Sequence, residues 1–224
     1  MKSLLILGYP RSMSTLIYHV ARNATKGRLK SLPLSEFHDG DPFNHVQKIN
    51  SSIKKVFGDK DLRRYNSYKK ILDDLSRDHI IKNVNQPLFV SKYLKENPHS
   101  YNVLLIERDL AEVVYALDRK GWYWPIEILT KKERVGESRL ENLCIAILKF
   151  EKLYRDNISK KVLISQKNAT VDHKLIPRKL KELGYPARVI NYIDDEFISE
   201  RERCSRYKTN AKYRKIQQFL RKNK

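Results

Sequence analysis

The stretch SLLILGYPRSMSTLIYHVAR, residues 3–22, decides the fold. Its apolar start, residues 4–7, is typical of a buried strand, and Gly8 and Pro10 then indicate a tight turn. Residues 12–15 lead into a helix whose apolar positions follow at helical spacing. A strand that runs directly into a helix leaves unpaired backbone N–H groups that point to one place. The partial positive charge of the helix N-terminus makes that place favourable for an anion.

The side chains of this turn suit a phosphate or sulfate group. Arg11 offers a planar fork of donors with a permanent positive charge, and Ser12, Ser14 and Thr15 add hydroxyls. The Gly-Lys pair of P-loop triphosphatases has no counterpart at this place, which argues against a metal-nucleotide triphosphatase. The alternative interpretation is a capped helix after a buried strand, with Arg11 in solvent.

Residues 9–15, YPRSMST, resemble the 5′-phosphosulfate loop of sulfotransferases, which use 3′-phosphoadenosine-5′-phosphosulfate (PAPS). The family pattern is Tyr-Pro-Lys/Arg-Ser-Gly-Thr/Ser-Thr, so this chain departs from it at Met13. A positive φ at that position would strain a methionine. The resemblance implies PAPS as cosubstrate, no metal, and cosubstrate contacts from Tyr9, Pro10, Arg11, Ser12, Met13, Ser14 and Thr15.

A second informative stretch covers residues 101–124. Residues 103–106 predict a strand buried on both faces, and Arg108 and Asp109 end it before a helix from about Leu110. This order resembles the 3′-phosphate segment of sulfotransferases, so the resemblance implies that Arg108 binds the 3′-phosphate. The alternative is a simple ion pair between Arg108 and Glu112, one helical turn on.

Two further points concern the binding of the 3′-phosphate: this chain lacks one family residue, and it has a late basic segment that could contribute. Sulfotransferases carry a serine eight residues after the arginine, whereas this chain has Ala116, which donates no hydrogen bond; Tyr115 and Ser138 are candidate substitutes. Family members bring a basic segment late in the chain over the 3′-phosphate, which here implies Arg206 or Lys208. The composition instead favours a basic helical segment from about residue 200 that is solvated or partly disordered.

Candidate catalytic residues follow the second and third predicted strands, residues 29–34 and 79–83. Parallel sheets place their chemistry beyond the carboxyl ends of strands. By the resemblance we expect Glu36 to act as general base, with His38 as the second candidate, and Lys82 to face the sulfuryl oxygens. The alternatives are a surface turn in residues 35–44 and an exposed lysine at position 82.

The remaining elements are predicted from their periodicity. Helices are expected within residues 49–77, with a break near Gly58, and over residues 87–95, 141–154 and 175–183; a further strand is expected over 161–165. The aromatic run at residues 121–125 either frames the acceptor or the adenine by stacking, or forms a hydrophobic lid. We expect one domain over residues 1–224, because no linker-like segment divides the chain.

Composition restricts the class of protein. The two cysteines fit neither a disulfide framework nor a metal site, and no apolar run has the length of a membrane span, so we expect a cytoplasmic protein without a membrane partner. The formal charge of +20 favours a polyanionic cosubstrate. Its scatter along the chain is equally compatible with a solvated basic surface, and it disfavours nucleic acid as the ligand.

Taken together, the sequence predicts a three-layer α/β domain with a mainly parallel central sheet of P-loop type flanked by helices. The expected activity is sulfuryl transfer from PAPS to a hydroxyl or amine. The acceptor stays open among small molecules, carbohydrates and peptides, and so does the oligomeric state. The rival classes are a nucleotide or small-molecule kinase on the same fold and a noncatalytic basic nucleic-acid binder.

Overall fold

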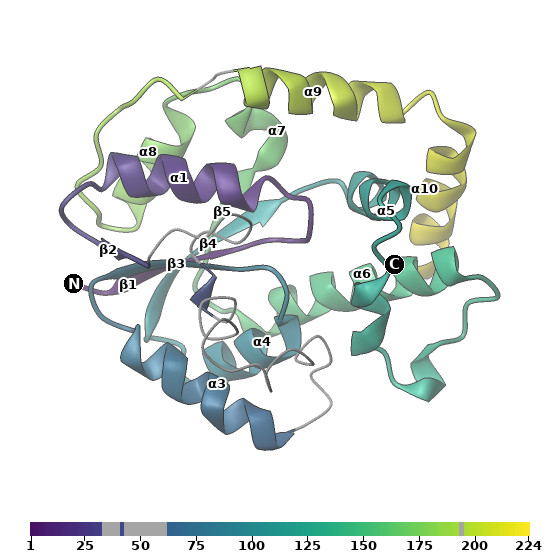
Figure 1. The fold of residues 1–224 in the computed structure, drawn as a ribbon, viewed down its shortest axis with the longest axis horizontal. Coiled ribbons are helices and arrows are strands. Elements are labelled where there is room, and N and C mark those ends of the chain that lie inside the picture. Colours follow the sequence, from purple (N-terminus) through teal and green to yellow (C-terminus); the bar gives the residue numbers. More distant parts are fainter. Residues whose placement is uncertain (33–40, 43–61, 193–194) are drawn as a thin grey trace.

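A computed structural model describes residues 1–32, 41–42, 62–192 and 195–224. In these residues the strands form one parallel sheet in the order β2-β3-β1-β4-β5, which confirms the predicted α/β class (Figure 1). Central β1 pairs with β3 through Leu5 and Ile81, and with β4 through Leu5 and Val103. The strands are β1 (Ser3–Leu7), β2 (Lys30–Ser31), β3 (His79–Asn83), β4 (Tyr101–Glu107) and β5 (Val162–Ser165).

Helices cover both faces of the sheet and make a three-layer arrangement (Figure 1). Alternate residues of β1 supply the two cores, because successive side chains of a strand point to opposite faces. On one face lie α1 (Ser14–Ala24), α7 (Gln166–Ala169) and α8 (Leu175–Glu182). On the other lie α3 (Leu62–Asp74), α4 (Pro87–Glu96), α5 (Leu110–Arg119), α6 (Arg139–Asn157) and α10 (Ala211–Asn223).

Local sequence signals explain where the helices begin and end. Asp109 caps α5 by accepting hydrogen bonds from the backbone N–H groups of Ala111 and Glu112 at 2.8 and 3.3 Å. Ser138 and Glu141 form a capping box at the start of α6. Helix α8 is followed by Gly184 with φ 84°, a left-handed conformation that glycine adopts at low cost. Two 3₁₀ turns, η2 (Trp124–Ile128) and η3 (Lys131–Glu133), join α5 to α6.

The C-terminal segment differs from the expected solvated tail. Helix α9 (Asp195–Tyr207) contacts α5, and α10 packs against α5 and α6 (Figure 1). The side chains of Tyr213, Ile216 and Leu220 are buried in the core. Their spacing of three and four residues makes an apolar stripe that the many Lys and Arg residues around it obscure in the sequence. These helices therefore belong to the domain and bring their basic side chains to fixed positions.

Two strands differ from what the sequence predicts, one in length and the other in burial. The second predicted strand, residues 29–34, is shorter in the structure, because β2 consists of two exposed residues at the edge of the sheet. The fifth strand, β5, lies at the opposite edge of the sheet. The side chain of Leu163 is 40% exposed, so β5 is only partly covered.

In the described residues, no helix combines the length and apolar character needed to cross a membrane. Glu36, His38 and the predicted helix before Gly58 lie outside the described residues.

Candidate functional site

The turn between β1 and α1 has an unusual backbone. Arg11 and Met13 both adopt left-handed conformations, with φ of 64° and 62°. Such angles cost an L-residue roughly 1–2 kcal/mol, and sulfotransferases place glycine where Met13 stands. The N–H of Ser12 donates to the carbonyl of Tyr9 at 3.1 Å and closes the turn. The Met13 position therefore does need φ > 0, and the chain accepts the strain with a methionine.

This strained turn leaves the N-terminus of α1 without a cap. Met13 is the N-cap residue, and its side chain makes no hydrogen bond to the first turn, which also carries no acidic residue. The first helical hydrogen bond runs from the N–H of Ile17 to the carbonyl of Met13, at 3.0 Å. The N–H groups of Ser14, Thr15 and Leu16 precede it, and these three residues line a cavity of about 440 Å³. This end of α1 is thus available to an anion.

Ser12 adds a buried hydroxyl without a partner. The residue is 0% exposed, and within the described residues its Oγ makes no hydrogen bond. Gly8 makes room for this hydroxyl, since a Cβ at Gly8 would lie 2.5 Å from the Ser12 Oγ. A buried hydroxyl without a partner costs free energy, which a bound ligand that offers an acceptor would recover.

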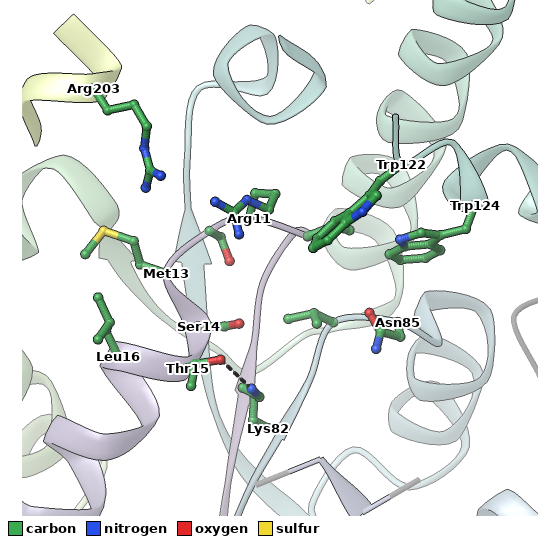
Figure 2. Close-up of a pocket in the computed structure, with 13 residues that line it drawn as sticks. Arg11, Met13, Ser14, Thr15, Leu16, Lys82, Asn85, Trp122, Trp124 and Arg203 are labelled. Atoms are coloured by element: carbon green, nitrogen blue, oxygen red, sulfur yellow. Dashed lines mark hydrogen bonds between the residues drawn. The ribbon is translucent and has the colours of Figure 1, made fainter. Parts of the chain in front are cut away.

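Three arginines lie close together at this turn. Arg11 lies in the turn itself, and Arg203 reaches toward the cavity from α9 (Figure 2). Arg108 follows β4 and lies next to Arg11. Burial and the nearby positive charges of Arg203 and Arg108 lower the pKa of Arg11. Like charges held together in this way raise the free energy of the empty site, and a bound anion would lower it.

Arg108 forms a hydrogen bond to the backbone of this turn. Its Nη1 donates to the carbonyl of Arg11, and its Nη2 lies 2.9 Å from the Cys204 Sγ. Its Nε lies 3.4 Å from the Glu112 carboxylate, and the side chain of Arg108 is 1% exposed. The alternative interpretation of Arg108, a pair with Glu112, is therefore present in the structure, although buried and joined to the anion turn. In this geometry Arg108 connects β4, α5 and α9 to the loop after β1.

The opposite wall of the cavity comes from β3 and from the aromatic run after α5. The Lys82 Nζ donates to the Thr15 Oγ1 at 2.7 Å, which brings this predicted residue to the helix end (Figure 2). Asn85 lies beyond the end of β3, and Trp122 and Trp124 complete the wall. The Arg11 guanidinium carbon lies 5.7 Å from the centre of the Trp122 ring. The aromatic run thus borders the anion site directly.

A second cavity, of about 460 Å³, has Arg108 in its lining. It is bounded by the ends of β4 and β5 and by α9. Its lining includes four cationic and three acidic residues, together with short polar side chains such as Ser165 and Ser205. The four cations are Arg108, Lys167, Arg201 and Lys208, and the three acids are Glu107, Asp109 and Glu112. Arg108 links this cavity to the anion turn, because it also donates to the Arg11 carbonyl.

Most of the predicted site residues meet at these two cavities. Pro10, Arg11, Ser12, Met13, Ser14, Thr15 and Lys82 line the first, and Arg108 and Lys208 line the second. Tyr9 does not line either one, since its ring is buried against Tyr154, with centroids 6.0 Å apart. Arg206 is directed to solvent: its side chain is 79% exposed and pairs with Glu202 at 3.7 Å.

The candidate substitutes for the missing serine contact do not reach the second cavity. Tyr115 packs against Tyr207 and Tyr213, with ring centroids 4.7 and 6.1 Å away. Ser138 accepts a hydrogen bond from the Glu141 N–H at 3.2 Å and serves as the α6 cap. In place of such a contact, the second cavity offers Arg201, which the sequence analysis did not single out.

Sequence reasoning also missed Arg203 and Asn85 as site residues. Phe197, Cys204 and Tyr207 are buried at helical spacing in α9, and this stripe identifies the inward face that Arg203 borders. This apolar spacing can be read from the sequence, and it predicts that Arg203 lies at the inward face of the helix and Arg206 on the outward face. Asn85 gave no signal of its own, since it follows β3 by two residues in an irregular loop.

Comparisons with known proteins add no further assignment. A scan of the sequence against protein-family models finds no match, and a search of curated proteins finds no similar sequence. In the described residues, no group of three or more His, Cys, Asp and Glu side chains is arranged to hold a metal ion.

Proposed function

We propose that this protein is a sulfotransferase that moves a sulfuryl group from PAPS to a hydroxyl or amine. The observation that carries the proposal is the cluster of arginines at the uncapped N-terminus of α1, where Arg11 and Arg203 line the cavity and Arg108 binds the Arg11 carbonyl. The proposal rests on this chemistry and on the sulfotransferase-like turn of residues 9–15.

The residues of the first cavity fit a phosphosulfate. Free N–H groups at a helix N-terminus and a guanidinium fork are the donors that bind tetrahedral anions most readily. The Ser12 Oγ, which has no hydrogen-bond partner among the described residues, offers one more donor. The strand arrangement supports this location, since β1 leads to α1 on one face of the sheet while β3 and β4 lead to α4 and α5 on the other. Ligands of such sheets bind in the crevice that this divergence creates.

The second cavity favours PAPS over a nucleoside triphosphate. PAPS carries its negative charge at two separate ends, the 5′-phosphosulfate and the 3′-phosphate. The first and second cavities match that distribution, with Arg201 and Lys208 of the second cavity available for the 3′ end. The phosphates of ATP, in contrast, form one continuous chain that would need a single extended site.

The contact between Lys82 and Thr15 supports the same choice. In P-loop kinases the hydroxyl at the start of the helix binds Mg²⁺. Here the Thr15 Oγ1 accepts a hydrogen bond from the Lys82 ammonium at 2.7 Å. A cation of the protein itself therefore lies beside the reacting anion. The parallel order with the anion turn after central β1 also agrees with the P-loop type of fold, which we include in the proposal.

The residues have separate roles in the proposed reaction. PAPS supplies a sulfuryl group whose S–O bond to the 5′-phosphate breaks as the acceptor forms its own bond to sulfur. Arg11 and the N–H groups of residues 14–16 stabilise charge that develops on the bridging and 5′-phosphate oxygens, and Lys82 orients the sulfuryl oxygens. The acceptor proton passes to a base, for which Glu36 and His38 remain the prediction from sequence.

Calorimetry with adenosine 3′,5′-bisphosphate, compared with ATP and Mg²⁺, tests this function. We expect the bisphosphate to bind more tightly than ATP. Arg11→Ala should weaken that binding about a hundredfold, because two charge-assisted hydrogen bonds are lost. Lys26→Ala is the matched control, since Lys26 is exposed after α1 and should leave the affinity unchanged.

Other outcomes would assign the protein to another class. Tighter binding of ATP that depends on Mg²⁺ would indicate a kinase. Affinity for nucleic acid that falls steeply with salt and does not respond to Arg11→Ala would indicate a noncatalytic binder. Equal effects of Arg11→Ala and Lys26→Ala would count against any role of the α1 turn.

A further inference from the structure

A third cavity, of about 630 Å³, adjoins the first one at the aromatic run after α5. Trp122 and Trp124 border both cavities, and their indoles form one wall of the third. Its other lining residues include Tyr123, Arg134, Arg139 and Asn142. The side chain of Trp122 is 46% exposed, although an indole would normally bury most of its apolar surface. The exposed indole can therefore act as a stacking platform for the ring of a ligand.

The polar groups around the platform are held in defined positions. The Arg139 guanidinium lies 4.1 Å from the centre of the Tyr123 ring, and the Tyr123 hydroxyl donates to the Asp118 carboxylate. The Asn142 carboxamide is fixed by Gly136, whose N–H lies 3.2 Å from the Asn142 Oδ1 and whose carbonyl accepts from Nδ2 at 2.9 Å. These contacts reduce the entropy that the side chains would lose when they bind a ligand.

Positive charge at this cavity is not neutralised by a direct pair. In the described residues, no carboxylate forms an ion pair with Arg134 or Arg139, and Glu127 is the acidic member of the lining. The Arg134 Nη2 donates only to the Ile126 carbonyl, at 3.4 Å. Two guanidinium forks with unused donors favour a carboxylate or another planar or tetrahedral anion.

We infer that this third cavity is the acceptor site, and that the acceptor is a hydroxylated ring compound that carries a carboxylate. The inference rests on the proposed sulfotransferase function. The ring would lie against the indole wall, and the carboxylate would bind Arg139 and Arg134. A hydroxyl on the opposite edge of the ring would then point past the edge of Trp122 into the first cavity, where the Arg11 guanidinium lies over the same indole. This arrangement would bring the acceptor hydroxyl to the cavity that contains the anion turn.

Two sources share this chemistry, a sugar acid and an aromatic hydroxy acid. Both offer a flat face, a hydroxyl and a carboxylate. D-glucuronate and 4-hydroxybenzoate represent them, and D-glucose and phenol are their matched neutral compounds. The member of each pair that lacks the carboxylate keeps the ring and the hydroxyl, so a difference within a pair reports the contribution of the arginines alone.

The chain contains two tryptophans, both in this wall, which makes the site directly observable. In ¹⁵N-labelled protein they give two indole N–H signals, which Trp122→Phe and Trp124→Phe assign. We expect one of the two acids to shift both signals and to bind about tenfold more tightly than its neutral counterpart. Arg139→Gln should remove that difference. Arg214→Gln, at an exposed arginine on α10 outside these three cavities, should preserve it.

The results separate this inference from the proposed function. Binding of one acid with loss in Arg139→Gln supports the acceptor site and identifies its source. Equal binding of acid and neutral compound, no shift with either acid, or an unchanged difference in Arg139→Gln would overturn it. None of these results depends on sulfuryl transfer, whereas calorimetry with adenosine 3′,5′-bisphosphate tests the function without reference to Arg139.

Discussion

Helices α1 and α5 begin at the same edge of the sheet, after two adjacent central strands, but their N-termini are built in opposite ways. At the N-terminus of α5, side chains of the protein itself provide the negative charge that a helix start favours. Asp109 caps the helix, and Glu112 places a second carboxylate in its first turn. Helix α1 has neither, and the residues near it are arginines. The comparison indicates that one helix end is used for stability and the other is reserved for an external anion.

The most severe test of this comparison removes the carboxylate that Arg108 uses at α5. Glu112→Gln should destabilise the protein by about 3 kcal/mol, because it removes the carboxylate charge 3.4 Å from a guanidinium that is 1% exposed. The measurement is denaturant unfolding. Glu182→Gln is the control: its pair with Lys179 is exposed, and its loss should cost less than about 0.5 kcal/mol. Similar costs for both variants would mean that Arg108 does not depend on Glu112.

A second test gives α1 the negative charge that α5 already has. Ser14→Asp places a carboxylate in the first turn of α1, beside the arginine cluster. We expect the affinity for adenosine 3′,5′-bisphosphate to fall about a hundredfold, equivalent to about 2.7 kcal/mol, because the new charge competes for the same donors. The melting temperature without ligand should rise, in contrast. A lower melting temperature would show that the arginines are not mutually destabilising.

The smallest effect concerns the backbone that distinguishes the two helix starts. Asp109 has φ −56°, whereas Met13 has φ 62°. Met13→Gly should therefore be more stable than Met13→Ala by about 1 kcal/mol, because both lose the side chain and only glycine relieves the left-handed strain. Denaturant unfolding of the two variants measures the difference. If the alanine variant matches the glycine variant, the turn is not strained at this position.

Local sequence patterns predict the main elements of the fold and the part of the candidate site that lies next to β1 and β3. Strand β4 and helix α5 follow from the apolar run and from Asp109 as a cap, and the turn after β1 follows from its own local pattern. Lys82 reaches the start of α1 because parallel pairing brings the ends of β1 and β3 together. Arg203 could not be placed in this way, since its position depends on how α9 packs against α5 across the sheet edge.

Other errors also trace to tertiary packing. The basic residues after position 200 suggested a solvated segment, but Tyr213, Ile216 and Leu220 fix α10 to the core. Tyr9 belongs to the loop motif, yet its ring turns to the opposite face of the sheet and packs on Tyr154. The strand order itself is not a local property, so the neighbours of β1 were not predictable from its residues.

The central place of β1 has a consequence for the growing chain on the ribosome. This strand is made before its partners β3 and β4, which end at residues 83 and 107, so about a hundred residues must follow before both of its edges are paired. At ordinary translation speeds that interval is about 5 to 20 seconds, during which four consecutive aliphatic residues remain uncovered. Nascent-chain chaperones would protect this interval, and Arg203 would join the other two arginines later still, because α9 follows β4 in the chain.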